Sequence, residues 1–248
     1  MIKFESVTKR YSEKITALEE ASFEVKEGEF VFLVGPSGAG KSTIIRLLVR
    51  EELPTSGTLE FMGQDIVGMS KKDIVKLRRN IGVVFQDFKL INSFTIRENI
   101  EFALEAAEKS EKDIKETSEY VLGLVGIADR GDLFPVQLSG GEKQKASIAR
   151  AMATNPKLLI ADEPTGNLDP SSTWDIVQLL NKINNWGTTV VMATHDQEVV
   201  NSLQKRVIEL ENGMIIRDDK SKGKYTNGNK KPVKEKPEKL KDNSTKKK

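Results

Sequence analysis

The chain contains no cysteine, only one histidine and no long apolar run. Without cysteine it forms no disulfide and no thiolate metal site, which fits a reducing compartment such as the cytosol. No segment approaches the roughly 20 apolar residues that cross a bilayer as a helix, so no transmembrane helix is expected. Residues 1–5 lack the apolar core of a signal peptide and are expected to begin a strand. The hydrophobic fraction of 38% and the charged fraction of 31% indicate a soluble globular protein.

Charge is unevenly distributed along the 248 residues. From Lys220 onward there are 12 lysines and three acidic residues, a net charge of +9. The preceding 219 residues hold 27 basic and 34 acidic side chains, a net charge of −7. Apolar residues become scarce after about Asp218, so we expect residues 219–248 to form a disordered Lys-rich tail. Such a tail is either a solubilising linker or an electrostatic contact with an anionic surface, and we expect anionic lipid rather than nucleic acid.

A glycine-rich segment separates the apolar run Phe30–Val34 from a helical pattern that begins near Ile44. This strand–loop–helix context is the one that a phosphate-binding P-loop requires. Glycines allow backbone N–H groups to approach a polyphosphate, and the following helix directs its positive end toward the same anion. A chance glycine-rich turn is the alternative for the motif alone. The expected nucleotide-binding residues are Gly35, Pro36, Ser37, Gly38, Ala39, Gly40, Lys41, Ser42 and Thr43.

Four side chains in and beyond this loop carry specific chemistry. Lys41 supplies a full positive charge for the β- and γ-phosphates, and Ser42 offers a hydroxyl to Mg²⁺, which prefers oxygen ligands. A continuous apolar strand at residues 157–161 is followed by two carboxylates. Asp162 is suited to hold Mg²⁺, and Glu163 is suited to polarise the attacking water. An acidic pair alone can simply end a strand, but together with a P-loop it predicts nucleotide hydrolysis.

A second glycine motif, Leu138-Ser139-Gly140-Gly141, precedes another helical pattern. A serine and two glycines at a helix start favour anion binding. One nucleotide site does not need two such loops. Dimerisation resolves this, because each copy can then contribute one loop to the other copy's site.

With these motifs in place, residues 1–218 resemble the ABC-type ATPases, the nucleotide-binding subunits of ATP-driven membrane complexes. The Leu-Ser-Gly-Gly sequence at 138–141 is the specific marker, because other P-loop ATPases lack it. The resemblance implies that ATP and Mg²⁺ bind and that two copies form an ATP-dependent, head-to-tail homodimer. It also implies that Ser139, Gly140 and Gly141 contact the γ-phosphate held by the partner subunit.

The same resemblance assigns four further residues. Tyr11 matches the aromatic residue that stacks on adenine, although an exposed tyrosine can also be a local packing residue. Gln86 matches the residue that contacts Mg²⁺ and the attacking water and senses the membrane partner. Asp169 belongs to the loop at residues 166–169, which matches the loop that crosses the dimer interface. His195, the only histidine of the chain, matches the residue that reaches the γ-phosphate.

The resemblance implies an α/β fold with a P-loop NTPase core of mostly parallel strands flanked by helices. An N-terminal antiparallel β subdomain and an inserted α-helical subdomain at about residues 88–155 are expected within a nucleotide-binding domain at residues 1–218. In the N-terminal part, alternation of apolar and polar residues predicts strands at 2–7 and 21–25, with Tyr11 in the connection between them.

Three sequence segments, at residues 85–90, 161–169 and 200–210, resemble the FtsE branch, the cell-division members of the family. This branch implies that dimer closure signals through an integral membrane partner resembling FtsX to control cell-wall hydrolysis, at the cytoplasmic face of the bacterial cell membrane. The segment at residues 161–169 is shared with lipoprotein-release and macrolide-export ATPases, so an exporter subunit is the alternative. A soluble ABC ATPase of DNA repair or translation fits poorly, because those proteins usually carry two nucleotide domains or a long coiled-coil insertion.

Overall fold

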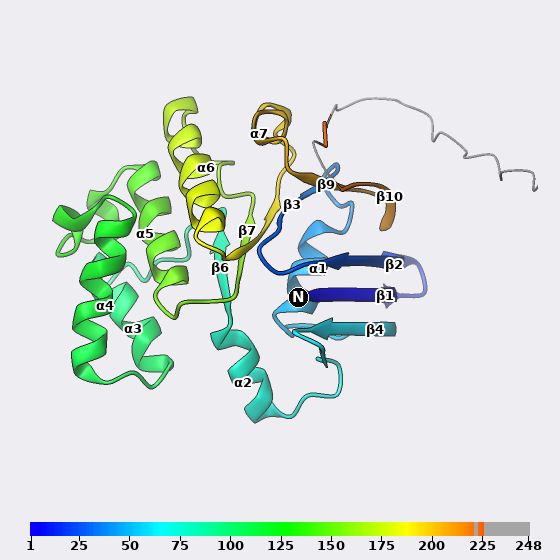
Figure 1. Ribbon diagram of the computed structural model, residues 1–248, viewed down its shortest axis with the longest axis horizontal. Coiled ribbons are helices and arrows are strands. Elements are labelled where there is room, and N and C mark those ends of the chain that lie inside the picture. Colours follow the sequence, from blue (N-terminus) through cyan, green and yellow to red (C-terminus); the bar gives the residue numbers. More distant parts are fainter. Residues whose placement is uncertain (221–222, 226–248) are drawn as a thin grey trace, which may run out of the picture.

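The computed structural model describes residues 1–220 and 223–225. Residues 221–222 and 226–248, which include most of the expected Lys-rich tail, lie outside the described residues. Figure 1 shows two sheets, with α3, α4 and α5 gathered at one side of the molecule and β1, β2 and β4 at the other. Within the described ranges, no helix has the length and apolar character that a membrane crossing requires.

The larger sheet has six strands in the order β10-β9-β3-β8-β7-β6. Neighbours are parallel except for the antiparallel pair β9 and β10. Every residue of β3 and β8 is buried, as continuous apolar strands are when helices cover both faces of a parallel sheet. The strand bounds are β3 (Phe30–Val34), β6 (Ile81–Phe85), β7 (Leu158–Asp162), β8 (Thr189–Ala193), β9 (Arg206–Glu211) and β10 (Met214–Asp219).

The smaller sheet is antiparallel, in the order β2-β1-β4-β5. Its strands are β1 (Ile2–Ser12), β2 (Ile15–Val25), β4 (Ser56–Phe61) and β5 (Gln64–Asp65). The first two strands are longer than predicted, because β1 and β2 stay paired through register shifts as far as Ser12 and Ile15. Tyr11 therefore lies within β1, and its expected place in a connecting loop is wrong. The alternation used for the prediction breaks at these bulges.

The helices begin at residues that cap them. Thr95 and Glu98, which have the Thr-x-x-Glu spacing, form a capping box at the start of α3. Helix α6 begins at Pro170, because the Asp169 carboxylate accepts N–H groups of its first turn and proline is favoured at the first helical position. The bounds are α1 (Lys41–Leu48), α2 (Lys71–Arg79), α3 (Ile96–Ala106), α4 (Glu111–Leu124), η1 (Ala128–Arg130), η2 (Pro135–Gln137), α5 (Gly140–Met152), α6 (Pro170–Asn185) and α7 (Gln197–Leu203).

These elements confirm the α/β fold class predicted from the sequence. The larger sheet is mostly parallel, as expected for a P-loop NTPase core, and the antiparallel sheet contains the N-terminal strands. Helices α3, α4 and α5 contact one another and lie between β6 and β7 in the chain. Asn212-Gly213 joins β9 to β10, with positive φ at both residues as a two-residue hairpin of this type requires.

The described chain continues beyond residue 218, the predicted end of the domain. Strand β10 ends at Asp219, and the backbone N–H of Gly223 donates to the Lys205 carbonyl at 3.1 Å. Tyr225 is 1% exposed and belongs to the larger hydrophobic cluster. The sequence conceals this contact, because Tyr225 is a single large apolar residue among lysines and glycines.

Candidate active site

Polar residues follow the carboxyl ends of four neighbouring parallel strands. The register pairs Asp162 at the end of β7 with Phe85 at the end of β6 and with Ala193 at the end of β8. Strand β3 lies on the other side of β8 and leads into the glycine-rich loop. Because parallel strands end at the same edge of a sheet, this register brings four distant chain segments together at the place where α/β sheets bind ligands.

The glycine-rich loop follows a path that side chains would block. A Cβ on Gly35 would lie 2.2 Å from the Leu210 carbonyl oxygen, and one on Gly40 would lie 2.7 Å from the Ala17 carbonyl oxygen. Both glycines also have φ in the left-handed range, +143° and +109°. Gly40 is the N-cap of α1, so the loop ends at the positive end of that helix. This arrangement suits a bound polyphosphate.

Lys41 places its charge inside this loop. Its Nζ donates to the carbonyl oxygens of Gly35 at 2.7 Å and Pro36 at 3.2 Å, and the residue is 7% exposed. The same Nζ lies 3.7 Å from Oε1 of Glu163. The ammonium group therefore lies between the loop backbone and the first carboxylate after β7.

Ser42 and Asp162 form a pair of oxygen donors beside the loop. The Ser42 hydroxyl donates to Oδ2 of Asp162 at 3.3 Å. Burial raises the pKa of Asp162 above its usual value, while the hydrogen bond from Ser42 opposes that shift. A hydroxyl and a carboxylate at this separation match the ligand preference of Mg²⁺, so the residues present fit the expected cation.

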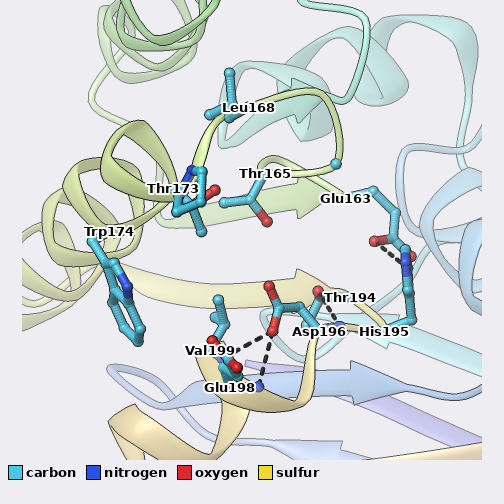
Figure 2. A pocket seen from close by; sticks show the side chains of 12 residues that line it. Glu163, Thr165, Leu168, Thr173, Trp174, Thr194, His195, Asp196, Glu198 and Val199 are labelled. Carbon is cyan, nitrogen blue, oxygen red and sulfur yellow. Dashed lines mark hydrogen bonds and ion pairs between the residues drawn. The ribbon is translucent and has the colours of Figure 1, made fainter.

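Glu163 sits at a sharp bend directly after β7. Its φ of +48° is uncommon for a non-glycine residue, and its N–H donates to the Ala193 carbonyl at 2.9 Å, which holds the bend. Its Oε2 lies 2.9 Å from Nδ1 of His195, as the dashed line in Figure 2 shows. Glu163 thus contacts both Lys41 and His195, through different carboxylate oxygens.

A pocket of about 300 Å³ opens beside this carboxylate. In Figure 2, Glu163 and His195 lie at one end, while Trp174 lies at the other. Oδ1 of Asp196 accepts the N–H groups of Glu198 and Val199 and caps α7. The pocket therefore has a charged end next to the expected chemistry and an apolar end at α6.

Ser139 is the N-cap of α5 and forms a capping box with Glu142. Oε2 of Glu142 accepts the Ser139 N–H at 2.9 Å, and Arg130 donates to Oε1 at 2.8 Å. The hydrogen bond from Arg130 and those from Ser139 lower the pKa of Glu142 to about 2. Across the described part of the chain, no hydrogen bond or ion pair joins residues 139–141 to residues 35–43. Within one copy, no such contact therefore links the two glycine motifs.

Tyr11, the expected adenine platform, is 47% exposed near the end of β1. Its hydroxyl donates to Oε1 of Glu52 at 2.8 Å, and Nζ of Lys9 lies 5.1 Å from the ring centroid. These contacts fix the ring while leaving it accessible. Glu52 was not predicted, because no motif or periodicity connects it with Tyr11.

The two remaining expected residues lie in different loops, Asp169 directly before α6 and Gln86 directly after β6. The Asp169 carboxylate accepts the N–H groups of Ser171 and Ser172, both at 3.0 Å, so it is engaged as a helix cap. The side chain of Ser171, whose hydroxyl donates to Oδ1 at 2.6 Å, and that of Ser172 hold the pKa of Asp169 well below its usual value, and the backbone N–H groups add to this shift. Gln86 is exposed directly after β6 and contacts Asn167, a residue of the loop before α6 to which sequence reasoning assigned no role of its own.

Comparison with known proteins agrees with this arrangement. The sequence profile of the family described as ABC transporter matches residues 18–166, well over half of the chain. The chain therefore belongs to the ABC transporter family and is an ATPase of the ABC type.

Among individual proteins, the chain is 50% identical over 225 residues to the cell division ATP-binding protein FtsE of Streptococcus pneumoniae serotype 2 (strain D39 / NCTC 7466), covering 91% of this chain and 97% of that protein. It is 50% identical to FtsE of Bacillus subtilis (strain 168), covering 91% and 98%. It is also similar to a solved ATP-binding cassette, a dimer in a post-hydrolysis state bound to ADP and Pi, with a TM-score of 0.80, 36% identity and coverage of 89% and 98%.

Proposed function

We propose that this ATPase is the ATP-hydrolysing subunit of an FtsE-like cell-division complex. ATP closes a homodimer, and that motion passes through an integral membrane partner resembling FtsX to control cell-wall hydrolysis from the cytoplasmic face of the membrane. The observation that carries the proposal is the 50% identity with FtsE proteins over 97–98% of their length. The cluster of Lys41, Asp162, Glu163 and His195 at one sheet edge supports the chemistry.

In this proposal Glu163 polarises the water that attacks the γ-phosphorus of ATP. A P–O bond to the water oxygen forms and the bond to the β-phosphate oxygen breaks, giving ADP and phosphate. His195 holds the Glu163 carboxylate by the 2.9 Å contact and reaches the γ-phosphate. Lys41 exchanges its carbonyl partners in the loop for phosphate oxygens.

Ser42 and Asp162 are proposed to hold the cation, with Gln86 as a further contact. When bound, Mg²⁺ neutralises charge on the β- and γ-phosphate oxygens. Tyr11 stacks on the adenine. The remaining loop residues, Gly35 to Gly40 and Thr43, surround the phosphates with backbone N–H groups.

The proposal includes a homodimer because no described hydrogen bond or ion pair joins Ser139, Gly140 and Gly141 to the P-loop of their own chain. Their proposed ligand is the γ-phosphate held by the partner subunit, with Asp169 close to the same interface. Glu142 does not oppose this anion, because Arg130 and Ser139 already engage its carboxylate. The start of α5 therefore keeps its positive end available.

The second candidate is an exporter subunit of the lipoprotein-release or macrolide-export type, which the sequence segment at residues 161–169 also favours. Purification of the full chain from its native membrane separates the two candidates. A four-helix membrane protein with one large outer loop, without a cargo-binding partner, supports the cell-division complex. A cargo-binding protein in the same complex supports the exporter.

The Lys-rich residues beyond Tyr225 are proposed to contact anionic lipid. Lysines near an anionic surface each contribute on the order of 1 kcal/mol at most, and salt screens them. This contact would offset repulsion between the membrane and the acidic body.

Substitution Glu163→Gln tests the chemical step. The amide keeps the shape but cannot polarise water as a carboxylate does, so turnover should fall at least about 100-fold. ATP should still bind and should hold the variant as a dimer in size-exclusion chromatography. The matched control is Glu198→Gln, which changes another carboxylate lining the same pocket and should retain activity. Near-normal hydrolysis by Glu163→Gln would show that another group activates the water.

A further inference from the structure

Gln86 is held by both its main chain and its side chain. Nδ2 of Asn167 donates to the backbone oxygen of Gln86 at 3.1 Å, and Nε2 of Gln86 donates to Oδ1 of Asn167 at 3.4 Å. Asn167 belongs to the loop between Glu163 and α6, whereas Gln86 directly follows β6. This amide pair therefore joins the segment after one strand end to the segment after its neighbour.

Gly166 provides the space for this contact. A Cβ on Gly166 would lie 2.8 Å from Nε2 and 3.2 Å from Cδ of Gln86. The φ of Gly166 lies outside the left-handed range, so any residue could adopt its backbone conformation. Glycine here lets the Gln86 amide pack directly on the backbone of the loop before α6, and a larger residue would displace that amide.

The rest of the segment that begins at Gln86 is attached to helices. Arg150 of α5 donates to the carbonyl oxygens of Phe88 at 2.9 Å and Lys89 at 2.5 Å. Asn99 of α3, 1% exposed, accepts the N–H of Ile91 at 2.7 Å and donates to its carbonyl at 3.1 Å. One end of the segment is thus hydrogen-bonded to α3 and α5, and the other end is hydrogen-bonded to the loop before α6.

We infer that Asn167 is a positioning residue for hydrolysis that acts through Gln86. This rests on the proposed function, which assigns Gln86 to the cation and the attacking water. A glutamine side chain has several rotatable bonds, and Asn167 and Gly166 together restrict the direction of its amide. ATP binding uses the P-loop and Tyr11, so loss of Asn167 should affect the chemical step and leave binding intact.

A double-mutant cycle in the full-length protein tests this inference. Asn167→Ala should lower kcat about tenfold with little change in KM for ATP. In a Gln86→Ala background, Asn167→Ala should have almost no further effect, because its partner is already gone. Gly166→Ala keeps every polar group but displaces the Gln86 amide, so it should give the same pattern. Asn92→Ala, at an exposed position on the same segment, serves as the matched control and should keep wild-type kcat.

Three results would overturn the inference. One is an unchanged kcat in Asn167→Ala. Another is a further tenfold loss of kcat when Asn167→Ala is added to Gln86→Ala. The third is failure of Asn167→Ala to dimerise with ATP in the Glu163→Gln background, because Asn167 would then serve the interface instead. Hydrolysis that depends on Glu163 but not on Asn167 rejects only this inference, whereas a wild-type chain without ATP hydrolysis rejects the proposed function.

Discussion

Replacing Tyr225 with alanine should destabilise the fold far more than replacing an exposed tyrosine. Tyr225 is 1% exposed and belongs to the same hydrophobic cluster as Phe30 and Val207. Truncating a buried aromatic residue to alanine costs about 3–5 kcal/mol. Each kcal/mol shifts Tm by about 2–4 °C in a domain of this size, so we expect Tm to fall by about 10 °C.

Urea unfolding followed by the fluorescence of Trp174 and Trp186 gives the corresponding free energies. Tyr120→Ala is the control, because Tyr120 is 68% exposed and should change stability by less than about 0.5 kcal/mol. Asn201→Ala removes two hydrogen bonds to the main chain of Tyr225, at 2.9 and 3.0 Å, and should cost about 1 kcal/mol for each. Equal stability of Tyr225→Ala and Tyr120→Ala would refute the packing of this segment on the core.

Two further predictions concern charge. The pKa of Glu142 is lowered from 4.5 to about 2, so its contribution to stability is full above pH 4.5 and is lost as pH falls toward 2. The difference in unfolding free energy between wild type and Glu142→Gln should shrink over that range, and a constant difference would contradict the assignment. Full-length protein should sediment with anionic vesicles at low salt more than a chain that ends at Tyr225 does. Equal sedimentation would reject the lipid contact.

Much of the candidate site could be located from the sequence, because its residues follow the ends of apolar segments. Continuous apolar segments identified β3 and β7, and the residues that follow them are brought to one edge because both strands belong to the same parallel sheet. The glycine pattern of the P-loop and the capping box at Thr95 are local signals of the same kind. Such signals need only neighbouring residues, so a single sequence contains them.

The contacts that hold these residues in place were not predictable. The amide pair of Gln86 and Asn167 joins positions 81 residues apart, and the bond from Tyr11 to Glu52 spans 41. Neither pair shares an element or a periodicity, so only the packing of the folded chain reveals them. Tyr225 was placed in the tail for the same reason, since its single aromatic ring carries no pattern.

The central claim is that one active site takes its P-loop from one copy and its Leu-Ser-Gly-Gly motif from the other. Lys41→Ala removes the first half, and Ser139→Arg blocks the second half while leaving ATP binding to its own P-loop. Each variant alone should be inactive. In a mixed dimer one site retains both Lys41 and Ser139, so an equal mixture should recover about a quarter of wild-type activity, given random pairing in a twofold dimer. A mixture as inactive as its parents would contradict the account, as would hydrolysis by Ser139→Arg alone.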